Sequence, residues 1–90
     1  MLMHNNRCYH QEIMHVQRMA AIHNRPQTTA RIGTEITNPN IDFAKVAQGM
    51  GVWAEGSITD PTKLGAALRR PLDVEKEGQP ALLDVICQPR

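Results

Sequence analysis

The stretch ALLDVIC, residues 81–87, decides the fold class of this chain. Its apolar run is too continuous for a strand with one face in water, so it predicts a strand that is buried on both faces. Buried strands of this kind belong to parallel sheets that are covered by helices. Working outward, VWAEG at residues 52–56 is a second candidate strand, and residues 1–3 resemble the end of a third.

Two segments between these candidate strands have simple helical patterns. Within residues 9–23, apolar side chains recur close to helical spacing and polar side chains lie between them. Within residues 42–50, apolar side chains at i, i+3, i+4 and i+7 predict a second helix with one apolar face, and Asp42 is its predicted N-cap. That face consists of Phe43, Val46, Ala47 and Met50.

A third helix is expected to begin at Thr59 or Asp60. Either side chain can cap it, and Pro61 suits the first turn, where a missing N–H has no consequence. Pro71 stands where the apolar pattern would otherwise continue. Because proline lacks the helical N–H and clashes with the preceding turn, we expect the helix to end or kink just before Pro71.

The predicted order is strand, helix, long loop, helix, strand, helix, strand. This alternation predicts an α/β fold with a parallel sheet and flanking helices. The loop, residues 24–39, is long enough that we expect it to be functional or to rest on a neighbouring surface. Ligands of parallel sheets bind at the carboxyl ends of the strands, and Asn5 and Asn6 occupy such a place.

The composition excludes several classes of function. The chain has 90 residues, enough for one small domain, and its net charge of +1 gives no basic footprint for nucleic acid. No apolar run approaches the roughly 20 residues of a membrane span. Cys8 and Cys87 form no CxxC pair, so we expect reduced thiols and a cytoplasmic location. Only 3% of the residues are aromatic, which suggests that the chain belongs to something larger.

The familiar catalytic motifs are weak here. His10 and His15 miss the i, i+4 spacing of a zinc protease, and the HQE sequence at 10–12 lacks the P-C-x-x-C of a zinc deaminase. Cys8 lies near a predicted helix start, a place that favours a nucleophilic thiolate, but it has no visible base partner. We interpret it as an inert thiol, and Asp84 as a hydrogen-bonded structural group. No catalytic residue is therefore predicted.

The pair Asn5-Asn6 has two possible roles. Asparagine is common in turns, so the pair can simply shape a turn at the end of the first strand. Alternatively, an amide oxygen there is offered to a metal ion. Magnesium binds oxygen ligands, and neutral ones complete its shell when a carboxylate and a diphosphate already supply negative charge. Ligands spaced i and i+2 on a tight turn can reach one ion, but the residues alone leave both roles open.

Three segments together resemble the C-terminal end of thiamine-diphosphate-dependent enzymes of the acetolactate synthase, benzoylformate decarboxylase and pyruvate decarboxylase group. They are HNNRCYHQE (4–12), NPNIDFAKVAQGMGVWAEGSITDPTKLGAALRR (38–70) and GQPALLDVICQPR (78–90). Each segment is moderately specific, whereas their order and spacing together are strong. The resemblance covers essentially the whole chain, and it implies thiamine diphosphate and Mg²⁺ as cofactors. Neither is expected to bind tightly to this chain alone.

The resemblance also implies site residues. In the family, the cofactor motif begins with Gly-Asp-Gly and closes with Asn-Asn, and the Asp, the second Asn and a main-chain carbonyl hold the magnesium. Carried over, Asn6 would give its side-chain oxygen and Cys8 its backbone oxygen, while Asn5 would shape the turn of the cofactor site. The Cys8 thiol has no implied role.

This sequence departs from the family because it contains no Gly-Asp-Gly. The domain that supplies the activating glutamate is also missing. Residues 1–90 are therefore expected to be an incomplete, C-terminal half of a thiamine-diphosphate-binding domain. The expected partner is the missing N-terminal part of the same enzyme, and family members are dimers or tetramers.

The resulting hypothesis is a fragment of a thiamine-diphosphate- and magnesium-dependent 2-oxo acid decarboxylase or carboligase, a lyase or transferase that is inactive as this chain alone. The alternatives are a stand-alone α/β protein-interaction module and a non-functional remnant. Exposed apolar surface, an unpaired sheet edge and self-association would favour the fragment. Cooperative folding without any partner would favour the module.

Overall fold

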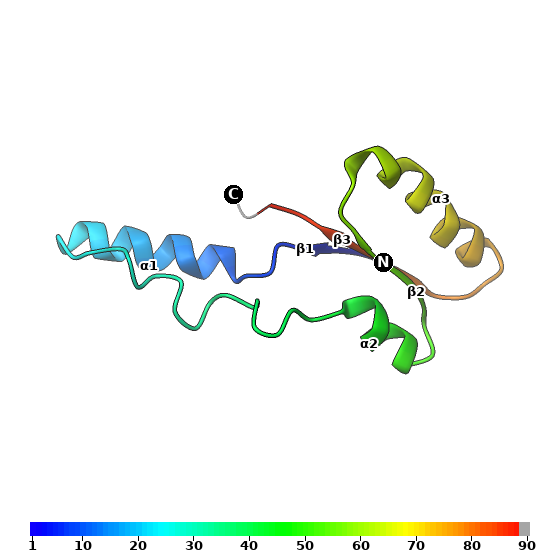
Figure 1. Ribbon diagram of the computed structural model, residues 1–90, viewed down its shortest axis with the longest axis horizontal. Coiled ribbons are helices and arrows are strands. Elements are labelled where there is room, and N and C mark those ends of the chain that lie inside the picture. Colours follow the sequence, from blue (N-terminus) through cyan, green and yellow to red (C-terminus); the bar gives the residue numbers. More distant parts are fainter. Residues whose placement is uncertain (89–90) are drawn as a thin grey trace. The chain divides into compact units, whose positions relative to one another are not determined.

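The computed structural model describes residues 1–88, so Pro89 and Arg90, which end the resemblance, lie outside the described part. The elements follow in the order β1 (Leu2–Asn5), α1 (His10–Ile22), α2 (Phe43–Gly49), β2 (Trp53–Ile58), α3 (Pro61–Lys76) and β3 (Ala81–Ile86) (Figure 1). This order confirms the predicted alternation. The described residues form two compact units: the sheet unit, residues 1–5 and 42–87, and the α1 unit, residues 6–41 with Gln88.

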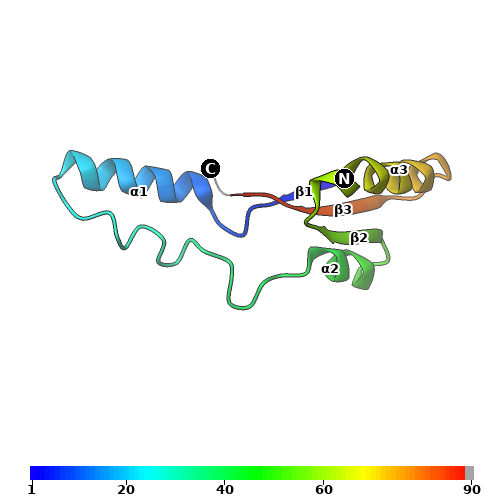
Figure 2. The same cartoon turned by 45° about the horizontal axis from the view of Figure 1, so that its top comes forward.

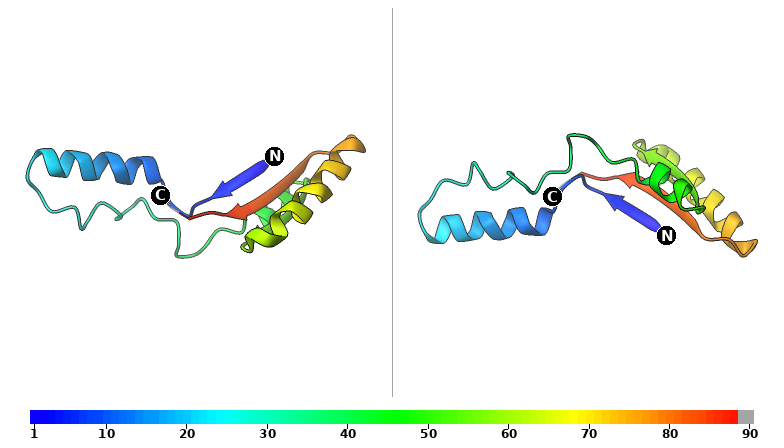
Figure 3. Two further views of the ribbon diagram at one scale, coloured as in Figure 1. Left: turned by 90° about the horizontal axis from the view of Figure 1, so that it is seen from above. Right: turned by 90° about the horizontal axis from the view of Figure 1, so that it is seen from below.

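The sheet unit is built on a parallel sheet with the strand order β1-β3-β2. β3 lies at the centre, where it pairs Leu83 with Leu2 on one side and with Glu55 on the other. Figure 3 shows β1 running beside β3. Leu83 is 1% exposed and Asp84 is fully buried. The prediction that ALLDVIC forms a buried parallel strand is therefore confirmed, and with it the α/β fold class.

The two helices of the sheet unit lie on opposite sides of the sheet (Figures 1 and 2). The predicted caps of both are confirmed. Asp42 accepts a hydrogen bond from the Lys45 N–H at 2.9 Å at the start of α2. Asp60 accepts one from the Thr62 N–H at 2.9 Å at the start of α3, whose first residue is proline. Local sequence chemistry thus sets where both helices begin.

The sequence predicted that the third helix would end or kink just before Pro71. The predicted end is wrong. α3 continues through Pro71 to Lys76. Proline at this position removes one hydrogen bond, the one to the carbonyl of Ala67. Both Pro71 and Ala67 are buried, so the helix is held by the packing of this face, and packing outweighs the local penalty.

The apolar face predicted for the second helix is partly wrong. The buried residues of α2 are Ala44 and Ala47, which pack with Ala54 of β2. Val46 is 49% exposed and Met50 is 78% exposed. Small alanine side chains allow α2 to approach the sheet closely, and the larger apolar side chains Val46 and Met50 stay largely exposed. The sheet unit consequently keeps an apolar surface around α2.

The α1 unit consists of α1 and a long returning segment, which has no further helix or strand element up to residue 41 (Figure 1). Ile13 of α1 and Ala30 of the returning segment are its buried apolar residues, each 3% exposed. An antiparallel bridge between Cys8 and Glu35 joins the returning segment to the start of the unit. The long loop predicted at residues 24–39 is confirmed as a loop, and its predicted function stays a prediction.

Candidate cofactor and metal site

Asn5 ends β1 at the carboxyl edge of the sheet, as predicted for a ligand-binding position. It is 4% exposed, and β3 holds both its main chain and its side chain. The Cys87 N–H donates to the Asn5 carbonyl oxygen at 2.9 Å, and Asn5 Nδ2 donates to Asp84 Oδ2 at 3.5 Å. Asn5 therefore acts as a fixed last residue of the strand rather than as an exposed ligand.

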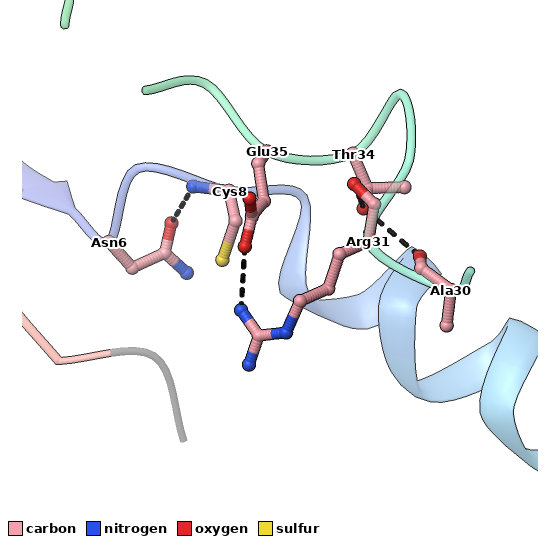
Figure 4. A network of polar contacts seen from close by, with 6 residues as sticks. All are labelled: Asn6, Cys8, Ala30, Arg31, Thr34 and Glu35. Carbon is pink, nitrogen blue, oxygen red and sulfur yellow. Dashed lines mark hydrogen bonds and ion pairs between the residues drawn. The ribbon is translucent and has the colours of Figure 1, made fainter. Parts of the chain in front are cut away.

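Asn6 forms the turn that follows. Its Oδ1 accepts a hydrogen bond from the Cys8 N–H at 3.2 Å, which closes a side-chain turn over Arg7 (Figure 4). Arg7 has φ 56°, a left-handed conformation that is uncommon for a residue other than glycine. An amide oxygen has two lone pairs, so Oδ1 can accept from Cys8 and still offer one to another partner. Forming a turn and holding a metal ion are therefore compatible roles for Asn6.

Cys8 lies in a short antiparallel pairing with the returning segment. The Tyr9 N–H donates to the Thr34 carbonyl and the Ile36 N–H donates to the Arg7 carbonyl, each at 2.8 Å. These two hydrogen bonds occupy the carbonyl oxygens of Thr34 and Arg7. No residue of the described part donates to the Cys8 carbonyl oxygen. That oxygen is therefore free of a hydrogen-bond donor within the described part, and the ligand role that the resemblance implies for it stays a prediction. The half-buried thiol is not in a disulfide.

Sequence reasoning named no partner for Glu35, which the structure places opposite Cys8. The Glu35 carboxylate pairs with Arg31 Nη1 at 2.7 Å (Figure 4). The i, i+4 spacing of the two residues was the sequence signal for this pair. Thr34 adds a hydrogen bond from Oγ1 to the Ala30 carbonyl at 3.2 Å, which also fixes this turn.

The oxygens at Asn6 and Cys8 fit magnesium as part of its shell. Mg²⁺ prefers oxygen donors in an octahedral arrangement and keeps waters, carboxylates and phosphate oxygens around it. The two donors here are neutral, so they suit an ion whose charge is balanced by a diphosphate. Residues 1–88 contain no group of three or more His, Cys, Asp and Glu side chains that could hold a metal.

The sheet unit contains a polar cluster at the last residue of β1. It consists of Asn5, Ser57 and Asp84. Ser57 Oγ donates to Asp84 Oδ2 at 2.8 Å, and Asn5 donates to the same oxygen. Asp84 Oδ1 has no hydrogen-bond partner among residues 1–88. The interpretation of Asp84 as a hydrogen-bonded group is confirmed, but the sequence did not connect it with Asn5.

Glycine is required beside this cluster. A Cβ atom at Gly56 would lie 2.6 Å from Asp84 Cβ and 2.8 Å from the Asp84 carbonyl oxygen. Atoms this close cannot coexist without a shift of the backbone. Gly56 therefore allows β2 to approach Asp84 closely enough for the neighbouring Ser57 hydroxyl to bind it.

Hydrogen bonds shift the pKa of two carboxyl groups at helix starts and of one guanidinium group in a surface ion pair. The backbone and side-chain hydrogen bonds with Lys45 lower the pKa of Asp42, and those from Thr62 lower the pKa of Asp60. The hydrogen bond to Glu55 raises the pKa of Arg70. Arg70 Nε and Nη2 both donate to the Glu55 carboxylate on the surface of the sheet unit. These charges support the fold and do not belong to the candidate site.

Three comparisons with known proteins gave one match, to a family model. The family model described as "Thiamine pyrophosphate enzyme, C-terminal TPP binding domain" matches residues 1–85. No curated protein and no solved structure gives a match to this chain. No helix in the described part of the chain is long and apolar enough to cross a membrane. The matched range includes Asn5, Asn6 and Cys8.

Proposed function

Because the chain belongs to the family of C-terminal TPP-binding domains of thiamine pyrophosphate enzymes, we propose that it supplies part of a magnesium–diphosphate site. Thiamine pyrophosphate is thiamine diphosphate, the cofactor that membership of this family implies. The observation that carries the proposal is the turn Asn6–Cys8. At one end of the turn, Asn6 Oδ1 has a second lone pair that the Cys8 N–H does not use. At the other end, the Cys8 carbonyl oxygen accepts no hydrogen bond from residues 1–88.

Each residue of the turn has a separate task. Asn6 Oδ1 and the Cys8 carbonyl oxygen bind Mg²⁺, and the hydrogen bond between Asn6 Oδ1 and the Cys8 N–H keeps the two residues in one turn. Asn5 anchors the turn to the sheet through its bonds to Cys87 and Asp84. When bound, thiamine diphosphate supplies an electron sink for chemistry at the carbonyl of a 2-oxo acid.

The remaining groups come from outside these residues. We propose a partner segment, the preceding part of the same enzyme, that brings the Asp of Gly-Asp-Gly and, across a dimer or tetramer interface, the activating glutamate. The strand order supports a partner, because among the described residues β1 and β2 each pair only with β3. An open strand edge readily accepts a further strand. The chain alone is then inactive.

The proposed reaction class is decarboxylation or carboligation of a 2-oxo acid, by a lyase or transferase of the acetolactate synthase type. It rests on the resemblance of the three quoted segments, since the residues that select the substrate lie mostly outside this stretch. A cytoplasmic location is proposed with it. The two unpaired thiols, Cys8 and Cys87, support a reducing compartment.

A protein-interaction module is the second candidate function, and one observation favours it. An apolar groove of about 480 Å³ lies in the sheet unit. α2 contributes Phe43, Val46 and Met50 to it, and the sheet contributes Ala81 and Leu82. An apolar patch of this kind can bind a protein partner. A non-functional remnant is the third reading, and it predicts no ligand binding at all.

The metal site can be tested with Mn²⁺, a paramagnetic substitute for Mg²⁺, on the complete 90-residue chain labelled with ¹⁵N. We expect Mn²⁺ to broaden the amide signals of residues 6–8 first, and more strongly when thiamine diphosphate is added. A module or a remnant would give no broadening centred on this turn. That result would remove the metal-site proposal.

A further inference from the structure

Asp84 is a fully buried carboxyl group in the central strand of a small sheet. The neighbouring residues of β3 are apolar, namely Leu82, Leu83, Val85 and Ile86. Its Oδ2 accepts hydrogen bonds from two side chains of the outer strands: Asn5, the last residue of β1, at 3.5 Å, and Ser57 of β2 at 2.8 Å. Asp84 thus connects all three strands through one oxygen atom.

Stability of the fold alone does not explain a carboxyl group buried at this position. A buried carboxyl group is unfavourable unless its oxygens are hydrogen-bonded, and no group in the described part of the chain bonds to Asp84 Oδ1. An apolar side chain of similar size would avoid that penalty at the centre of a parallel sheet. The side chain is also tightly enclosed, because Gly56 leaves no room for even one additional carbon atom beside it. A buried polar group with an unsatisfied atom points to a role beyond packing.

We propose that Asp84, supported by Ser57, is a positioning residue for the Asn5-Asn6 pair. This inference rests on the proposed function, in which Asn6 binds the metal ion. Asp84 holds the Asn5 side chain, while Cys87 holds the Asn5 carbonyl oxygen at 2.9 Å. That carbonyl belongs to the peptide group that links Asn5 to Asn6. Both the side chain and the carbonyl group of Asn5 are therefore held, so the peptide group from which the Asn6 turn begins is fixed at its Asn5 side.

The first test uses the wild-type chain and hydrogen exchange of asparagine side-chain amides, measured by NMR. The Asn5 side-chain NH₂ should exchange at least about tenfold more slowly than those of Asn24 and Asn40, which are exposed. Equal exchange rates would overturn the inference before any variant is made. This measurement does not depend on whether a variant folds.

The second test compares substitutions of Asp84. Asp84→Asn keeps an acceptor oxygen and should preserve slow exchange at Asn5, whereas Asp84→Val removes the acceptor and should abolish it. The folded Asp84→Val variant should also lose most of the Mn²⁺ broadening at Asn6 and Cys8. Asp73→Asn is the control, because Asp73 is exposed and paired only with Lys76. It should leave both signals unchanged.

Ser57→Ala provides a variant that retains the carboxyl group. The variant should shift the Asn5 side-chain amide signals. Once the Ser57 hydroxyl is removed, Asn5 is the one donor left, within residues 1–88, of the two that share Asp84 Oδ2. Unshifted signals would contradict a shared oxygen.

If wild type broadens with Mn²⁺ and a folded Asp84→Val variant broadens equally, the positioning role fails and the proposed function stands. If wild type shows no broadening, the proposed function fails, and the positioning role fails with it.

Discussion

Asn6 Oδ1 accepts a hydrogen bond from the Cys8 N–H at 3.2 Å, so the two proposed magnesium ligands belong to one closed turn. A side-chain oxygen that already holds a turn is fixed in place before any ion arrives. The left-handed Arg7 between them makes this turn a local departure from ordinary backbone geometry. Of the two roles that the sequence left open for Asn6, the structure shows the turn former, and the proposed ligand role would use the same oxygen atom.

Replacing Asn6 with aspartate tests the ligand role by charge. Asn6→Asp keeps an oxygen that can accept from Cys8 and adds a negative charge, so Mn²⁺ should bind the chain alone more tightly. The broadening of residues 6–8 should then appear at lower Mn²⁺ concentrations than in wild type. Weaker binding in Asn6→Asp would mean that this oxygen does not face the ion. Asn40→Asp, in an exposed loop position, controls for charge added elsewhere.

Gly56→Ala should destabilise the sheet unit. The new Cβ would lie 2.6 Å from Asp84 Cβ, and overpacking of this kind costs about 1–3 kcal/mol of unfolding free energy. Urea unfolding followed by circular dichroism measures the difference. The matched control is Gly65→Ala in α3, where a Cβ meets nothing within 4 Å. That change should be neutral or stabilising by up to about 1 kcal/mol, since alanine favours helices. Equal effects would show that the contact with Asp84 is not tight.

Pro71→Ala should stabilise the chain. Alanine restores the N–H that can bond to the Ala67 carbonyl and removes the ring from a helix interior, a penalty of about 3 kcal/mol. Part of the gain is offset because Pro71 is buried and alanine is smaller. The urea midpoint should rise. A lower midpoint would show that the buried ring contributes more than the missing hydrogen bond costs.

The two helix caps should make stability fall in acid. Hydrogen bonds lower the folded-state pKa of Asp42 and Asp60 below the ordinary value of 3.8. A carboxyl group with a lowered folded pKa contributes stability above its unfolded pKa and loses that contribution as pH falls through the folded value. Asp60→Ala should therefore lower the urea midpoint near neutral pH, and the difference from wild type should shrink below about pH 4. A difference that stays constant with pH would contradict the cap as its cause.

The parts of the fold that depend on nearby residues could be predicted. ALLDVIC predicted a buried strand because its apolar run has no wet face, and Asp42 and Asp60 predicted helix starts because capping is a contact within a few residues. Pro71 shows where this reasoning fails. The local penalty for proline is known from sequence, but the packing that outweighs it depends on how α3 contacts the sheet.

The site could be predicted from the sequence only through the resemblance. The resemblance implies ligands at Asn6 and Cys8, and this assignment stays a prediction, while the structure adds that the two residues form one hydrogen-bonded turn. The link from Asn5 to Asp84 could not be found, because it joins residues 79 positions apart through a sheet register that the sequence does not reveal. Similarly, periodicity gave an apolar face for α2 but did not show that Ala44 would be buried in place of Val46.

Selective ¹³C labelling of cysteine carbonyl groups tests the central claim most directly. The chain has only two cysteines, so the spectrum contains one signal from Cys8 and one from Cys87, which serves as an internal control. On addition of Mg²⁺ with thiamine diphosphate, the account predicts a shift of the Cys8 signal and an unchanged Cys87 signal. An unmoved Cys8 signal, or equal shifts of both, would contradict a magnesium ion bound at the Cys8 carbonyl.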